Sequence, residues 1–137
     1  MGLRIIAGEL RGRRLAAVPG LLTRPTADRT RESIFNILGR AVRDAQVLDL
    51  FAGTGAYGIE ALSRGAAFVA FVEEERRACQ VIEENLNQLH LLGSPALRLL
   101  KRPAGAALKI LQQEGRKFDI VFLDPPYREA ELYGATL

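Results

Sequence analysis

The chain has 137 residues, of which 48% are hydrophobic and 26% charged, and its formal net charge is +3. These values are typical of a soluble globular protein with one modest domain. No apolar stretch approaches the roughly 20 residues that span a bilayer, the start lacks the apolar core of a signal peptide, and the single cysteine excludes a disulfide framework, so we expect a cytoplasmic protein without membrane contact.

The charge is distributed unevenly along the chain. Residues 1–31 contain seven arginines and two acidic residues, a balance of +5, whereas residues 32–137 contain twelve basic and fourteen acidic residues, a balance of −2. A basic segment on a near-neutral body favours a polyanionic partner, although a solvated surface with additional arginines would give the same pattern. Guanidinium groups suit bidentate phosphate contacts. The candidate contacts are Arg4, Arg11, Arg13, Arg14, Arg24, Arg29 and Arg31.

The first 41 residues predict a ribbon, a linker and a helix. Residues 3–18 alternate loosely and contain Gly8 and Gly12, which predicts a short β-ribbon with a turn around residues 9–12. After the linker, the apolar residues at 34, 37, 38 and 41 have helical spacing, and Thr26 or Asp28 is the expected N-cap.

From residue 46 onward, strand and helix patterns alternate. The apolar segments 46–51, 67–73, 96–101 and 118–124 predict strands. Of the three helical segments between them, the first ends near Ser63, and the next two span residues 74–92 and 104–115. Alternation of this kind predicts βαβ units with right-handed crossovers and a mostly parallel sheet, which is a Rossmann-like α/β fold.

A glycine-rich turn follows the first of these strands. Gly53-x-Gly55-x-x-Gly58 directly follows the strand and opens a helix, which is the context that this motif requires. Glycines permit a tight turn and close approach of a ligand to the backbone. A dinucleotide and S-adenosylmethionine are both candidate ligands, and a tight turn that binds nothing is the alternative.

Two carboxylates flank this turn in the predicted fold. Asp49 lies four residues before Gly53, where it would repel a pyrophosphate but accept the cationic methionine end of S-adenosylmethionine. Glu73 ends the next strand and can accept two ribose hydroxyls, as an acid does in dinucleotide folds as well. Asp49 would equally serve as a capping acid for the turn.

The fourth strand is followed by "DPPY", residues 124–127. Proline fixes φ and restricts the residue before it, so this segment is a stiff arm that holds one carboxylate and one aromatic ring. In a parallel sheet the arm lies at the same edge as the glycine-rich turn. Two prolines after a strand are also common as a simple terminator.

Together these motifs resemble a known family. "DLFAGTG", "VE" and "DPPY" resemble the class I S-adenosylmethionine-dependent methyltransferases that modify exocyclic amino groups of bases. "RIIAGELRGRRL", "TRPTADRTRESIFNIL" and "GIEALSRGA" are similar to the RsmD-type 16S rRNA guanine-N2 methyltransferases of bacteria. The resemblance implies an RNA-contacting ribbon over residues 1–25 and a partial cofactor-binding domain over residues 26–137. It also implies 16S rRNA or a small-subunit assembly particle as partner, no metal, and a monomeric full-length protein.

The resemblance also implies roles for individual residues. Asp124 and the Pro125 carbonyl would accept hydrogen bonds from the guanine amine, Pro126 would stiffen the arm, and Tyr127 would stack on the base. The seven arginines of residues 1–31 would contact RNA, although Arg29 and Arg31 would alternatively pin the first helix over the cofactor. The implied cofactor contacts are Asp49, Phe51, Ala52, Gly53, Thr54, Gly55 and Glu73.

The chain departs from the family pattern in two ways. Arg102-Pro103 stands where the family usually has an acidic residue for the adenine amino group, so backbone groups are expected to recognise adenine. The family sheet has seven strands, whereas four are predicted here, which leaves the last one as an apolar edge. We therefore expect this chain alone to be inactive or poorly soluble. A DNA or other amino-methyltransferase and an inactive cofactor- or RNA-binding fragment are the alternatives, and a nicotinamide oxidoreductase is a more distant one.

Overall fold

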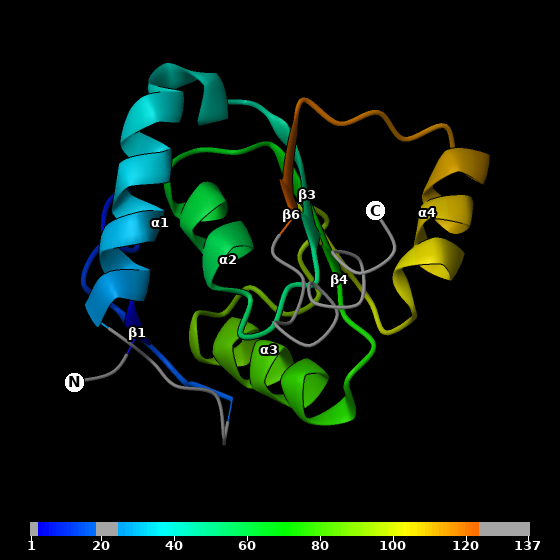
Figure 1. Cartoon of the computed structure of the whole chain (residues 1–137), viewed down its shortest axis with the longest axis horizontal. Helices are drawn as coiled ribbons and strands as arrows, with labels where there is room; N and C mark the ends of the chain where they lie inside the picture. Colours follow the sequence, from blue (N-terminus) through cyan, green and yellow to red (C-terminus); the bar gives the residue numbers. More distant parts are fainter. Residues whose placement is uncertain (1–2, 19–24, 124–137) are drawn as a thin grey trace, which may run out of the picture.

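The computed structural model describes residues 3–18 and 25–123 (Figure 1). For residues 25–27 it describes the backbone alone. The elements in chain order are β1 (Leu3–Arg4), β2 (Arg14–Leu15), α1 (Pro25–Leu38), the 3-10 helix η1 (Gly39–Val42), β3 (Gln46–Leu50), α2 (Ala56–Ser63), β4 (Phe68–Val72), α3 (Arg76–Gln88), β5 (Leu97–Leu100), α4 (Ala104–Gln113) and β6 (Ile120–Leu123).

The strands β3 to β6 form one sheet with the order β5-β4-β3-β6. All three strand pairs are parallel. The last residues of the four strands are in register, since Leu50 pairs with Val72 and Leu123, and Val72 pairs with Leu100. The predicted parallel α/β sheet is confirmed, and its carboxyl edge brings together the ends of all four strands.

Helices cover both faces of this sheet. α1, α2 and α3 lie on one side and α4 on the other (Figure 1). Phe35, Ile59 and Ile82, one from each of the first three helices, belong to one core cluster, while Ala107 and Leu111 of α4 belong to a second. Because helices cover both faces, the central strand β4 is buried at every position, as expected for a parallel sheet.

The element boundaries agree closely with the predicted ones, except at the start of the first helix and at both ends of the predicted helix 74–92. The four strands lie within two residues of the predicted segments. The predicted N-cap of the first helix, Thr26 or Asp28, is wrong, because α1 begins at Pro25, a residue type that suits the first turn of a helix, and both residues lie inside it. The predicted helix 74–92 is too long, because α3 spans 76–88. The Glu75 side chain accepts hydrogen bonds from the N–H groups of Arg77 and Ala78 and so caps the helix start. The helix ends before His90, whose φ is 58°.

The N-terminal ribbon is packed into the body of the protein. β1 and β2 pair antiparallel, with Leu3 opposite Leu15. Leu3, Ile5 and Leu15 are buried in the same cluster as Phe35 of α1. The predicted ribbon is therefore confirmed, and one hydrophobic core holds it together with the helices.

The strand β6 forms an edge of the described sheet. Within residues 3–18 and 25–123 it pairs with β3 alone. Its side chains Val121 and Leu123 are 53% and 64% exposed. The expected apolar edge strand is thus present in the described part of the chain.

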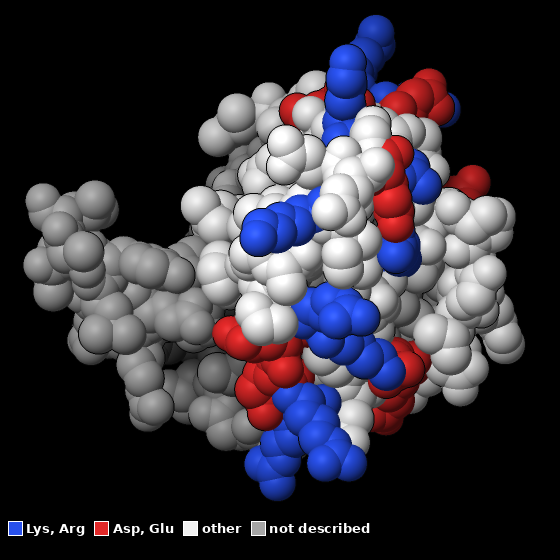
Figure 2. All heavy atoms as spheres, turned by 90° about the vertical axis from the view of Figure 1, so that its right-hand side faces the viewer, with Lys and Arg blue, Asp and Glu red and all other residues white. Residues whose placement is uncertain are grey.

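The face that carries α4 has mixed charge. Figure 2 shows basic and acidic side chains interspersed over it among the residues described.

None of the helices in the described segments is long and apolar enough to cross a membrane. No cluster of three or more metal-ligating side chains occurs among these same residues.

Gly8 is expected to be essential for docking of the ribbon. Its φ is +87°, and an added Cβ would lie 1.9 Å from the carbonyl oxygen of Ser63. Gly12 has a similar φ of +84°, but no atom of residues 3–18 and 25–123 lies within 4 Å of the position that a Cβ would occupy there. Gly12→Ala should therefore cost about 1–2 kcal/mol for the left-handed backbone alone, and Gly8→Ala clearly more. Urea denaturation measures both free energies of unfolding, and equal losses would contradict the close approach.

Candidate functional site

The chain between β3 and α2 makes the predicted glycine-rich turn. Gly53 and Gly55 have φ values of 60° and 81°, and Gly55 is the N-cap residue of α2. Gly58 faces β4, because an added Cβ would lie 2.3 Å from the Phe71 ring. The glycines thus provide the turn and the close helix–strand packing that the motif requires. Phe51 is a non-glycine residue with φ of 62°, a strained conformation that often marks a functional site.

Asp49 holds the start of α2 from inside the sheet. The side chain is buried, and its Oδ2 accepts a hydrogen bond from the N–H of Gly58 at 2.9 Å. A carboxylate at the first turn of a helix is stabilised by the helix dipole. The structure therefore shows the capping role that the sequence left open. A contact of Asp49 with a cofactor stays a prediction.

Glu73 connects the end of β4 to the glycine-rich turn. Its Oε1 accepts a hydrogen bond from the N–H of Gly53 at 2.8 Å, and its Oε2 accepts one from the N–H of Glu75 at 3.0 Å. Cys79 of α3 donates its thiol to the Glu73 carbonyl at 3.2 Å. Burial, and then the charge of Glu73, raise the pKa of the Cys79 thiol, which keeps this side chain in its unreactive protonated form.

The remaining predicted cofactor residues lie in the same turn. The N–H of Ala52 donates to the Val72 carbonyl at 2.9 Å, which ties the turn to the end of β4. Thr54 Oγ1 accepts a hydrogen bond from the N–H of Ala56 at 3.2 Å. The structure thus brings together Asp49, Phe51, Ala52, Gly53, Thr54, Gly55 and Glu73 at the carboxyl edge of the sheet.

The proposed catalytic arm, Asp124 to Tyr127, lies outside the described residues. Leu123, which directly precedes it, pairs with Leu50 at the end of β3. The arm therefore starts from the edge that carries the glycine-rich turn. Arg102 and Pro103, at the predicted adenine position, are exposed at the start of α4.

Sequence reasoning missed Asn85, which joins the ribbon to the glycine-rich turn. The side chain is fully buried, its Oδ1 accepts a hydrogen bond from the N–H of Ala16 at 2.6 Å, and its Nδ2 donates to the carbonyls of Ala16 and Thr54 at 3.2 and 3.0 Å. The signal that could have found it is a polar residue on the apolar stripe of α3, beside Val81, Ile82 and Leu86.

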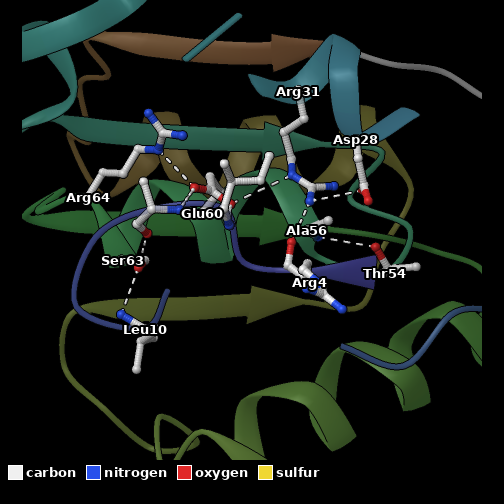
Figure 3. Close-up of polar contacts among 12 residues, drawn as sticks. Arg4, Leu10, Asp28, Arg31, Thr54, Ala56, Glu60, Ser63 and Arg64 are labelled. Carbon is white, nitrogen blue, oxygen red and sulfur yellow. Dashed lines mark hydrogen bonds and ion pairs between the residues drawn. The ribbon is translucent and has the colours of Figure 1, made fainter. Parts of the chain in front are cut away.

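A second missed residue, Glu60 of α2, holds the other side of the ribbon (Figure 3). The side chain is fully buried. Its Oε1 accepts the N–H of Ile6 at 2.9 Å, and its Oε2 accepts the N–H of Ala7 at 3.0 Å and Nε of Arg64 at 2.8 Å. A buried carboxylate needs such compensation, because burial of an unpaired charge is costly.

For Arg31 the sequence left open an RNA contact or a role in holding the first helix, and its burial contradicts the RNA contact. It is 2% exposed, and its NH2 donates to the Arg4 carbonyl at 2.7 Å and lies 3.2 Å from Asp28 Oδ1. Its Nε lies 3.7 Å from Glu60 Oε1 (Figure 3). Arg31 therefore holds α1 against the ribbon and α2, and its guanidinium is buried among these elements.

The other predicted RNA contacts are mostly at the surface. Arg4, Arg11, Arg13, Arg14 and Arg29 are exposed, and Arg24 lies outside the described residues. The Arg13 guanidinium donates to the Gln88 carbonyl at 3.0 Å, so it ties the ribbon to the end of α3. The remaining four guanidiniums form no ion pair with the residues described.

The parallel sheet, the glycine-rich turn and the acid that directly follows β4 define an α/β fold of the class I methyltransferase type. A family model described as "Conserved hypothetical protein 95" matches residues 3–137. The chain therefore belongs to this family, which is the RsmD family that the sequence motifs resemble.

Known relatives agree with this assignment. The chain is 43% identical over 132 residues to "Ribosomal RNA small subunit methyltransferase D" of Escherichia coli, in an alignment that covers 95% of this chain and 63% of that protein. The solved structure of the Escherichia coli protein yhhF is 44% identical, with a TM-score of 0.76 over 91% of this chain and 65% of that one. A "SAM Dependent Methyltransferase" from Agrobacterium tumefaciens is 26% identical, with a TM-score of 0.64 over 82% of this chain and 36% of that one.

Asn85→Asp is expected to loosen the junction between the ribbon and the glycine-rich turn. The variant keeps the shape of the side chain but loses both N–H donors and places a carboxylate against two carbonyl oxygens. We expect the free energy of unfolding at pH 7 to fall by about 1–3 kcal/mol. Asn87→Asp, at an exposed position of the same helix, is the matched control. Urea denaturation that gave the same small loss for both variants would contradict this role.

Proposed function

We propose that the chain is the cofactor-binding part of an S-adenosylmethionine-dependent methyltransferase that modifies the N2 amine of a guanine in small-subunit rRNA. The names of the Escherichia coli and Agrobacterium tumefaciens relatives support the RNA substrate and the cofactor. The observation that carries the proposal is the contact of Glu73 with Gly53, at the edge from which β6 leads into "DPPY".

The residues at the turn fit the cofactor. No atom of the described residues lies within 4 Å of the position that a Cβ on Gly53 would occupy, so within this part of the chain the backbone is accessible to a ligand there. An ionised carboxylate has about four acceptor sites, and the Glu73 carboxylate uses one at each oxygen for a backbone N–H. It retains acceptor capacity for the two ribose hydroxyls.

The charge at the turn favours a cationic ligand over a pyrophosphate. The Glu73 carboxylate lies against the backbone of the glycine-rich turn, and the Asp49 carboxylate lies against the first turn of the helix that follows it. Two carboxylates attract the sulfonium and ammonium groups of S-adenosylmethionine and repel a diphosphate. When bound, this cofactor supplies an electrophilic methyl group.

The chain's own contribution to methyl transfer is positioning. Asp124 and the Pro125 carbonyl accept hydrogen bonds from the guanine amine, and the two prolines keep these acceptors in place. Correct orientation of the two reacting groups can by itself supply a large part of a rate acceleration. Tyr127 stacks on the base, which returns about 1–3 kcal/mol of the few kcal/mol that extrusion of a base costs. The substrate is the rRNA itself or an assembling small subunit.

Glu73→Gln tests the observation on which the proposal rests. The amide keeps one acceptor oxygen but loses the charge and cannot serve both ribose hydroxyls. We expect the affinity for S-adenosylhomocysteine to fall about 10- to 100-fold, the usual effect of losing a charged hydrogen bond. Calorimetric titration measures it, with Glu74→Gln at the exposed neighbouring position as the control. Equal affinities for the two variants would refute the assignment of Glu73.

Asp124→Ala separates catalysis from cofactor binding. In a form of the protein whose wild type transfers methyl groups, we expect S-adenosylhomocysteine to bind with unchanged affinity and methyl transfer to small-subunit rRNA to fall about 100-fold or more, the range for loss of a positioned acceptor. Transfer of labelled methyl groups to free rRNA, to assembling particles and to DNA measures both rate and substrate class. If transfer persisted at the wild-type rate, the proposed mechanism would be wrong.

A further inference from the structure

A second concave site lies between the ribbon and α1, apart from the glycine-rich turn. It encloses about 330 Å³, a volume at the small end of the range for ligand pockets. Ribbon and helix both contribute to its wall, and the Arg31 contacts with Arg4 and Glu60 help the hydrophobic core to hold these two elements together. The charged and glycine residues that line it are Arg4, Arg11, Gly12, Asp28, Arg29 and Glu32.

Three of the residues that line this pocket are exposed arginines, which are available to a ligand. Arg4, Arg11 and Arg29 are exposed, and none of them forms an ion pair with the residues described. Arg4 contacts Arg31 through its backbone carbonyl, so its guanidinium takes no part in that hydrogen bond (Figure 3). Several arginines in the lining of one pocket are suited to a phosphate group.

Two carboxylates in the same wall make a bare phosphate a poor ligand. Asp28 is paired with Arg31 at 3.2 Å and is held in place by it. Glu32 is exposed, lies one helical turn further along α1, and has no ion pair among the described side chains. A carboxylate accepts hydrogen bonds from base N–H groups, in the way that acidic side chains accept from exocyclic amines.

We propose that this pocket binds one unpaired nucleotide of the RNA substrate, separate from the guanine that is methylated. Arg4, Arg11 and Arg29 hold its phosphate, and Glu32 accepts hydrogen bonds from the base edge. Guanine presents two N–H groups side by side on its Watson–Crick edge, so a guanine is favoured over uracil. Single-stranded RNA is commonly read through such splayed-out bases.

The position of the pocket suits a substrate contact. The first turns of α1, which contribute three of its lining residues, lie at the end of the molecule where β3 and β4 terminate (Figure 1). An RNA strand held there reaches toward the carboxyl edge of the sheet, where the glycine-rich turn lies. This inference rests on the proposed RNA substrate.

The test measures RNA binding by fluorescence anisotropy with two short single-stranded RNAs. Both are uridine-rich, and they differ at one position, which is guanine in one RNA and uracil in the other. Arg29→Ala is expected to weaken binding of both RNAs about tenfold and to reduce the salt slope by about 0.7, the value for one phosphate contact on a single strand. Arg40→Ala is the control, because it removes the same charge from an exposed position in η1, which follows the opposite end of α1 from the pocket. It is expected to change affinity less than twofold.

Glu32→Gln tests the base contact. It is expected to remove the preference for guanine while leaving affinity for the uridine RNA unchanged or slightly increased. The proposal is overturned if Arg40→Ala weakens binding as much as Arg29→Ala, or if Glu32→Gln leaves the guanine preference intact. Titration of the wild-type chain with S-adenosylhomocysteine distinguishes failure of the pocket from failure of the proposed function. If the chain binds S-adenosylhomocysteine but the pocket variants do not alter RNA binding, only the proposed nucleotide pocket is rejected. If the chain binds RNA but not S-adenosylhomocysteine, the proposed function is rejected.

Discussion

The glycine-rich turn depends on two carboxylates that reach it from adjacent strands. Asp49 of β3 accepts the N–H of Gly58 at 2.9 Å, and Glu73 at the end of β4 accepts the N–H of Gly53 at 2.8 Å. The first contact fixes the helix that follows the turn and the second fixes the turn itself. Since β3 and β4 are central and in register, the two acids can meet the turn only if the parallel sheet forms correctly.

A second pair of charged residues attaches the outer elements to this sheet. Glu60 accepts hydrogen bonds from two backbone N–H groups of the ribbon, and Arg31, which lies on α1, donates to the Arg4 carbonyl in the ribbon. Asn85 completes the attachment from α3 and contacts the Thr54 carbonyl in the turn itself. The basic ribbon, as the proposed RNA contact, is therefore joined by hydrogen bonds to the proposed cofactor site. Leaving one of these buried polar groups without its partner would cost more folding free energy than the contact itself contributes. The contacts therefore favour this one arrangement of ribbon and helices over others.

The sequence predicted what local patterns determine. Apolar runs and the spacing of Gly53, Gly55 and Gly58 depend on neighbours within a few residues, so the sheet and the turn could be predicted from them. The burial of Arg31 could not, because its partners Arg4 and Glu60 lie 27 and 29 residues away and meet only after folding. Glu75 falls inside the predicted helix, whereas in the structure it caps that helix, since a capping acid and a helical acid look alike in a run of glutamates.

Calorimetric titration of the chain with S-adenosylhomocysteine and with NAD tests the central claim most directly. The account predicts one binding site for S-adenosylhomocysteine and no measurable heat of binding with NAD, because two carboxylates at the turn repel a pyrophosphate. Binding of NAD with no response to S-adenosylhomocysteine would contradict it, and so would the absence of binding by both ligands in a folded chain.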